Sequence, residues 1–170
     1  MPPDFAQRVV RWHPAILTVV LLAGLLVQLS VSGLTLPPLA RGILMLTPLG
    51  PMCLWLWAVF YVARRASVTV ISGHWDWVFV LPPAIAFAAG IAGWSTNNSP
   101  AATMIFLSLF VGLSLSGKTL ENVAAADGNA PVGRMLATVL LMYFAPIGIW
   151  LLRSKILRVA AQANATLRPV

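Results

Sequence analysis

Two histidines, His13 and His74, are the residues of this chain best suited to hold a metal ion or a haem. Two imidazoles from different helices can ligate such a group between them. Each of these residues lies where an apolar stretch begins, and neither has a second ligand at helical spacing. The run His74-Trp75-Asp76 is more typical of a polar loop at a membrane surface. The sequence therefore predicts no metal site and no haem site.

Catalysis by side chains alone is also poorly supported by the sequence. A hydrolase needs a nucleophile with a base within hydrogen-bond reach, but no Gly-x-Ser-Gly occurs and no histidine lies inside an apolar stretch. Metal-assisted phospholipid synthesis needs several helix aspartates, whereas Asp127-Gly128 is followed only by Arg134. The acids are dispersed over three regions outside the apolar stretches: Asp4, Asp76, Glu121 and Asp127. We predict no catalytic residue and no cofactor, and we expect that the protein is not an enzyme.

Transport is compatible with the sequence only in some forms. An ion carrier normally has an ionisable group inside the membrane, and the apolar stretches contain none. A channel or a carrier of neutral solutes needs only hydroxyl, amide and carbonyl groups. Side chains that could line such a path are Gln28, Ser30, Ser32, Thr47, Ser108 and Ser114. Hydrogen bonds between helices would explain the same residues equally well.

The composition determines which kind of element carries these residues. Only 9% of the 170 residues are charged, against about 25% in a soluble domain. The hydrophobic fraction is 59% and the mean hydropathy is +0.88, so the surface cannot be that of a soluble fold. The basic residues lie between apolar stretches, which indicates orientation in a membrane and not binding of nucleic acid. The single cysteine, Cys53, is expected to fill volume within a helix.

Five apolar stretches approach the length needed to cross about 30 Å of hydrocarbon. They are residues 14–34, 43–63, 77–93, 101–117 and 136–152. We predict an all-α, polytopic integral membrane helix bundle, in which residues 1–170 form a single transmembrane domain and 153–170 form a basic interfacial tail. Four stretches are expected to cross, and the fifth is either re-entrant or a kinked fifth span. The first stretch is expected to be a retained helix and not a cleaved signal peptide.

Small residues indicate where the helices pack against one another. Spacings of four recur in the third and fourth stretches, at Ala86, Ala89, Gly90, Gly93, Ser108, Gly112 and Ser116. Small side chains allow close approach of helix backbones where lipid provides no hydrophobic driving force. We therefore predict that 77–93 and 101–117 form a tight antiparallel hairpin. The same surface could instead mediate dimerisation.

The basic residues also predict the orientation of the chain. With a cytoplasmic N-terminus and five crossings, six basic residues lie inside and five lie outside. If the fifth stretch enters the membrane and returns, ten lie inside and one lies outside. The run Ala145-Pro146-Ile147-Gly148 is expected to break the helix about halfway across the bilayer. The charge bias thus favours the re-entrant form, and a kinked spanning helix is the alternative.

Five of the basic residues are expected to contact anionic lipid headgroups on the cytoplasmic side or a partner protein. These residues are Arg64, Arg65, Arg153, Lys155 and Arg158. In the C-terminal tail, Ile156, Leu157 and Val159 lie among the basic residues, as in a short helix on an anionic leaflet. A solvated, frayed tail is the alternative for the residues beyond Ala163.

The C-terminal third of the chain is the most distinctive part of the sequence. It contains Lys118-Thr119-Leu120-Glu121, then Phe144-Ala145-Pro146-Ile147-Gly148-Ile149-Trp150 and a basic tail. Over about 50 residues this resembles a group of uncharacterised small multi-pass bacterial membrane proteins. Those chains pair a Lys-Ser/Thr-x-Glu element with a terminal Phe-Pro-Ile-Gly-Ile-Trp and a Gln-Pro-basic-Ile-Asn ending.

This chain departs from that pattern at three points. Ala145 separates Phe144 from Pro146, Arg153-Ser154-Lys155-Ile156 stands in place of Gln-Pro-basic-Ile, and Leu157 replaces the Asn. The resemblance implies a bacterial inner membrane and carries no activity. Together the observations favour an accessory or scaffold subunit that acts by helix–helix association. Its expected partners are the bilayer and a second copy or another membrane protein, with no nucleic acid. An oligomeric channel or neutral-solute transporter is the alternative.

Overall fold

The computed structural model describes residues 3–31, 34–67, 73–94, 100–125 and 128–165. Within these ranges the structure is helical and contains no strand, so the prediction of an all-α fold is confirmed. The elements are α1 (Pro3–Arg11), α2 (Pro14–Ser30), α3 (Pro38–Ala66), the 3₁₀ helix η1 (Gly73–Phe79), α4 (Leu81–Ala92), α5 (Pro100–Ala124), α6 (Val132–Tyr143) and α7 (Ala145–Ala165).

Several of these helices are long and apolar enough to cross a membrane. Three of the described segments meet this condition by themselves: α3, the continuous run His74–Ala92, and α5. Helices α1 and α2 meet at 91° and would add a fourth span if the pair is counted as one. Helices α3 and α5 begin before and end after the second and fourth predicted stretches, 43–63 and 101–117.

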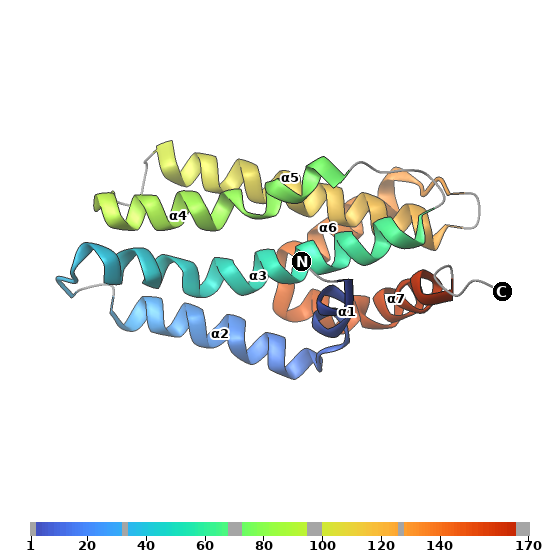
Figure 1. Cartoon of the computed structure of the whole chain (residues 1–170), viewed down its shortest axis with the longest axis horizontal. Helices are drawn as coiled ribbons and strands as arrows, with labels where there is room; N and C mark the ends of the chain where they lie inside the picture. The colour runs from blue at the N-terminus through green and yellow to red at the C-terminus, as the bar shows by residue number, and fades with distance from the viewer. Residues whose placement is uncertain (1–2, 32–33, 68–72, 95–99, 126–127, 166–170) are drawn as a thin grey trace.

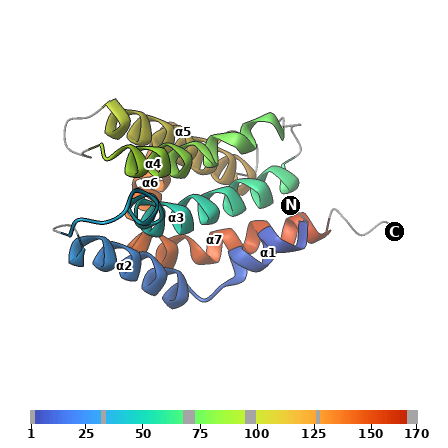
Figure 2. The same ribbon diagram turned by 60° about the vertical axis from the view of Figure 1, so that its left-hand side comes forward.

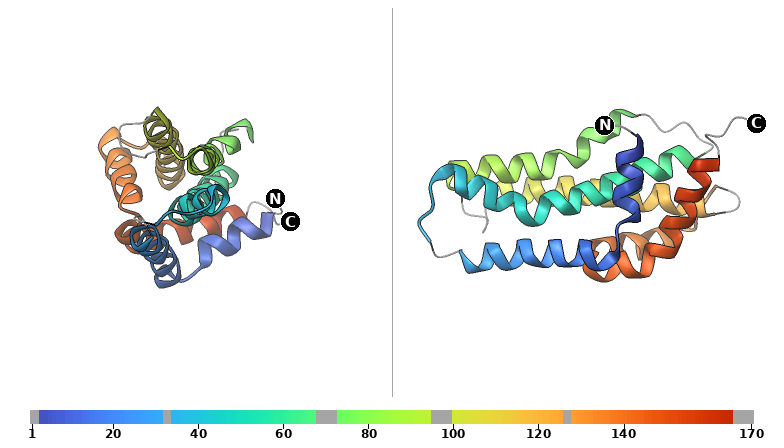
Figure 3. Two further views of the ribbon diagram at one scale, coloured as in Figure 1. Left: turned by 90° about the vertical axis from the view of Figure 1, so that its left-hand side faces the viewer. Right: turned by 60° about the horizontal axis from the view of Figure 1, so that its bottom comes forward.

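Helix α3 is the centre of the bundle. It packs against α1, α2, α4, α5 and α7 and buries the large side chains of Trp55, Leu56 and Phe60. Figures 1 and 2 show α2 and α4 on different sides of α3, with α5 beside α4, and the right-hand view of Figure 3 shows α1 lying across the bundle. The core therefore follows the length of α3, and the other helices surround it.

Two prolines lie inside α3 without breaking the helix. Pro48 has no N–H to donate to the carbonyl of Leu44, and the Thr47 hydroxyl donates to that carbonyl instead, at 2.7 Å. The same hydroxyl lies 3.2 Å from the carbonyl of Gly24 on α2. A Cβ at Gly24 would lie 2.6 Å from the Thr47 carbonyl oxygen, so only glycine allows α2 to approach α3 this closely.

The small residues of α4 and α5 pack mainly onto α3 and η1. A Cβ at Gly90 would lie 2.8 Å from Gly42 on α3, and Ser116 of α5 donates to the Leu56 carbonyl of α3 at 3.1 Å. Gly112 faces the ring of Phe79 at the end of η1. Helices α4 and α5 are in contact as the predicted hairpin requires, but these close approaches are to α3 and η1.

The fifth apolar stretch is divided into two helices. Phe144, with φ −86° and ψ 57°, ends α6, and α7 begins at Ala145. A Cβ at Gly148 would lie 1.8 Å from the Leu141 carbonyl oxygen, so the fold-back between the two helices requires glycine there. Figures 1 and 3 show that α6 runs part of the way along the bundle and that α7 returns toward the end from which α6 came.

The predicted interfacial tail, residues 153–170, is helical as far as Ala165. Helix α7 continues through this region and packs against α1 and α3. Its apolar side chains recur at helical spacing and are buried in the protein: Leu152, Ile156, Val159, Ala160 and Ala163. Ile156 and Val159 therefore belong to the core and not to a lipid interface. Residues 166–170, including Arg168, lie outside the described residues.

Candidate functional site

The most polar cluster of the interior forms around Glu121. This residue follows Leu113 and Gly117 at spacings of four along α5, and all three are buried. Continuing α5 beyond residue 117 thus places a carboxylate on the apolar face of the helix. The side chain of Glu121 is fully buried, although its position between apolar stretches led us to expect it outside the bundle.

Three polar side chains from the α6–α7 hairpin surround this carboxylate. The Thr138 hydroxyl of α6 and the Lys155 ammonium of α7 both donate to Glu121 Oε1. The Arg134 guanidinium lies 3.3 Å from Oε2, without the geometry of a hydrogen bond. Buried carboxylates require such partners because they have lost their hydration. The cluster therefore fastens α5 to both arms of the hairpin.

The Glu121 carboxylate is flanked by two cations. Lys155 and Arg134 both lie within ion-pair distance of it, and Thr138 is buried beside it. Lys155, predicted to contact a lipid headgroup or a partner, donates to Glu121, and its side chain is 27% exposed. The arrangement is suited to holding α5, α6 and α7 together.

The other predicted headgroup contacts lie in different settings. Arg64 pairs with Asp76 of η1 at 3.0 Å, and its guanidinium lies over the rings of Phe60 and Tyr61. Arg65 lies over the Tyr61 ring, 4.9 Å from its centre. Arg153 is partly exposed and Arg158 is exposed on α7. Of the five, Lys155 and Arg64 are thus engaged in ion pairs within the chain.

The seven predicted packing residues also differ in their surroundings. Ala86, Ala89, Gly90, Gly112 and Ser116 are buried. Gly93 ends α4 in the left-handed conformation, with φ +70°, and lies against the Arg41 side chain. Ser108 is partly buried, and its hydroxyl donates to carbonyls of its own helix.

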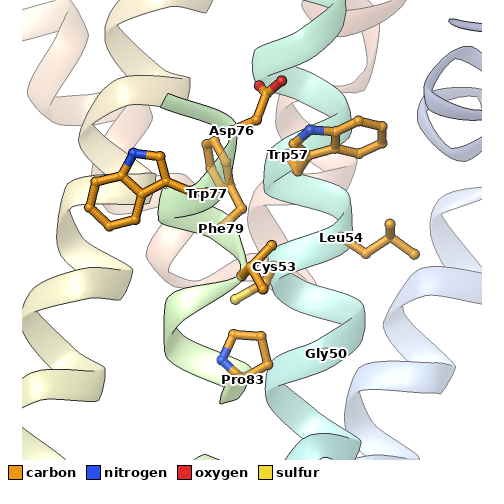
Figure 4. A pocket seen from close by; sticks show the side chains of 9 residues that line it. Gly50, Cys53, Leu54, Trp57, Asp76, Trp77, Phe79 and Pro83 are labelled. Carbon is orange, nitrogen blue, oxygen red and sulfur yellow. The ribbon is translucent and has the colours of Figure 1, made fainter. Parts of the chain in front are cut away.

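An apolar groove lies between α3 and the η1–α4 segment (Figure 4). Its volume is about 410 Å³, and it is lined by Gly50, Cys53, Leu54, Trp57, Asp76, Trp77, Phe79, Val80 and Pro83. Trp77 and Val80 are more than half exposed, so the groove opens on the outside of the bundle. Figure 4 shows the Asp76 carboxylate at the end of the groove far from Pro83. The groove was not expected from the sequence, because two separate helices form it.

The residues predicted as possible channel linings bond mostly to backbone. Ser30 donates to the Leu26 carbonyl, and Gln28 donates to the sulfur of Met45 at 3.5 Å. Ser32 lies outside the described residues. Ser114 is partly buried on α5. Of these side chains, Gln28 and Thr47 bond from one helix to another, whereas Ser30 and Ser108 bond to carbonyls of their own helices.

His13 has a structural role at the start of α2. His13 caps α2 by accepting from the Ala15 N–H at 3.2 Å, and its ring meets Trp150 edge to face. Among the described residues there is no group of three or more His, Cys, Asp or Glu side chains that could hold a metal ion. Comparison of the chain with protein-family models, curated proteins and solved structures finds no match.

Proposed function

We propose that the chain is a multi-pass inner-membrane protein that acts by helix–helix association, as an accessory or scaffold subunit. In this proposal α2, α3, the η1–α4 segment and α5 cross the membrane, and the α6–α7 hairpin enters and returns. The N-terminus, the 125–131 connection and the C-terminus then lie in the cytoplasm. The resemblance of the C-terminal third to small bacterial membrane proteins agrees with this setting.

The outer face of α2 is the observation that carries the proposed association. Only four positions of this helix are buried, namely Pro14, Leu17, Leu21 and Gly24, and α2 packs only against α3 and α7 among the described helices. The remaining face is apolar and exposed, with Ile16, Val19, Leu22, Leu26 and Leu29. A helix held along one narrow stripe leaves most of its circumference available to a second transmembrane helix.

The proposal is tested by photo-crosslinking in the native membrane. A photoreactive amino acid at Leu22 or Leu26 should give discrete crosslinked products with a second copy or with another membrane protein. Phe106 and Leu107 of α5 are matched controls, since they are comparably exposed and apolar, and they should react with lipid alone. Crosslinks to lipid alone at all four positions, with a monomer after purification in mild detergent, would reject association through α2.

The alternative function, an oligomeric channel or neutral-solute transporter, predicts a different experimental result. Reconstituted liposomes would then show solute-specific flux, and substitution of Gln28 or Ser108 would abolish it. Such a result would replace the accessory-subunit proposal, because a subunit that acts only by association conducts nothing by itself.

A further inference from the structure

The groove between α3 and the η1–α4 segment has the form of a ligand site. Its volume of about 410 Å³ falls within the range of roughly 300–1,000 Å³ found for small-molecule sites. Most of its lining is apolar and belongs to helices long enough to span a membrane. An occupant that reaches it from the bilayer must therefore present an apolar chain.

One end of the groove is charged. Asp76 lies there and is neutralised by Arg64. Trp57 of the groove wall contacts Tyr61, with ring centres 5.3 Å apart, and Arg65 lies over the same Tyr61 ring. Trp57, Tyr61 and Arg65 thus form a continuous row along α3, one turn apart.

The charges at this end do not cancel. Arg64 and Asp76 form one ion pair, whereas Arg65 makes a cation–π contact and no ion pair among the described residues. Arg65 does not line the groove itself, but through the row Trp57–Tyr61–Arg65 it places one net positive charge just beyond the charged end of the groove. A phosphate is the group in a membrane that complements such a cation, through charge-assisted hydrogen bonds.

We propose that this groove binds one anionic phospholipid. An acyl chain would lie along Gly50, Cys53, Leu54 and Trp57, and the phosphate would meet Arg65. The net charge selects an anionic lipid over a zwitterionic one, because the second charge of a zwitterion has no free counter-charge here. This site is separate from the outer face of α2, and it does not depend on the association proposed above.

Native mass spectrometry of the full-length protein in mild detergent tests the site. The probes are phosphatidylglycerol and phosphatidylcholine with identical acyl chains. We expect one tightly held phosphatidylglycerol per chain, bound at least ten-fold more strongly than phosphatidylcholine. Equal retention of the two lipids by the unaltered protein would overturn the proposal, and this comparison does not depend on any variant.

Two substitutions locate the site, each with a matched control. A Cβ at Gly50 meets nothing within 4 Å, so Gly50→Leu should fill the groove and abolish binding, whereas Gly133→Leu on α6, equally free of neighbours, should not. Arg65→Gln should weaken phosphatidylglycerol binding about ten-fold, the effect of losing one charge-assisted hydrogen bond. Arg158→Gln removes an equal charge and should change binding less than two-fold.

Two other outcomes would also overturn the proposal. If Gly50→Leu and Arg65→Gln retain lipid as well as their controls do, the lipid lies elsewhere on the bundle. If a co-purified membrane protein, and no lipid, is lost on Gly50→Leu, the groove serves a partner helix. Retention of α-helical circular dichroism by each variant establishes that the comparison is between folded proteins.

Discussion

At the scale of single residues, Glu121 is the centre of the polar contacts inside the bundle. It is the only charged side chain among the described residues that is fully buried, and its contacts come from two helices that follow it in the chain. A buried ion pair contributes little net stability compared with apolar packing, but removing one partner is costly. The cluster therefore specifies how the hairpin docks more than it adds to stability.

Replacing Lys155 by methionine should destabilise the protein by about 3 kcal/mol, near the lower end of the cost of breaking a buried pair. Arg134→Met should cost about 1 kcal/mol or less, since the Arg134 side chain is 52% exposed. The double variant Glu121→Leu/Lys155→Met should recover most of the loss, because no charge is left buried alone. Equilibrium unfolding in mixed micelles of increasing SDS measures these differences, and equal losses for Lys155→Met and Arg134→Met would contradict this account.

The α6–α7 hairpin is the distinctive element of the fold. Pro146 and Gly148 mark its turn in the sequence, and the chain does break beside them. This break could be predicted because proline and glycine act locally on the backbone. The burial of Glu121 could not, since it depends on α5 continuing past residue 117 and on two later helices packing there.

The other elements also differ in whether a local sequence pattern predicts them or whether they depend on tertiary packing. The apolar stretches located the long helices well, because uncharged, mostly apolar runs of 17 to 21 residues leave few alternatives. Helix α1 was missed, although Ala6, Val9 and Val10 form a buried face on it, because nine residues give too short a pattern. The groove has no signature in either helix alone.

Gly148→Ala should open the turn of the hairpin, because the new Cβ would lie 1.8 Å from the Leu141 carbonyl oxygen. We expect a loss of about 3 kcal/mol or more, at the upper end of the cost of overpacking. Gly133→Ala is the control, and it should stabilise α6 by about 0.5–1 kcal/mol. Thermal unfolding followed by circular dichroism compares the two variants. A Gly148→Ala protein as stable as the unaltered one would show that the fold-back does not require glycine.

Charge is strongly segregated over the whole molecule. Figure 1 shows α1, the final turns of α3 and α5, and the open end of the hairpin gathered toward one part of the bundle. These elements carry nearly all the basic residues of the described chain, whereas Arg41, in the first turn of α3, is at the opposite end. Such an imbalance orients membrane proteins, with the basic end in the cytoplasm.

The proposed orientation predicts which cysteines react with an impermeant maleimide in intact cells. With Cys53 replaced by alanine, a cysteine at Thr35 or Thr96 should be labelled from outside. A cysteine at Asp127 or after Arg168 should be labelled only after the membrane is permeabilised. Labelling of the C-terminal cysteine from outside, with Asp127→Cys protected, would show that the fifth apolar stretch crosses and would overturn the re-entrant arrangement.

The two short connections at the less charged end have a consequence for biogenesis. Residues 31–37 and 93–99 contain no Asp, Glu, Lys, Arg or His, and Arg41 is the single charge near them. In the proposed orientation, an insertase would move only this one arginine through the hydrocarbon, and centring an arginine there costs about 2.5–3.5 kcal/mol on insertion scales. Each pair, α2–α3 and α4–α5, can then enter as a preformed loop from the cytoplasm, with no need for a translocation motor.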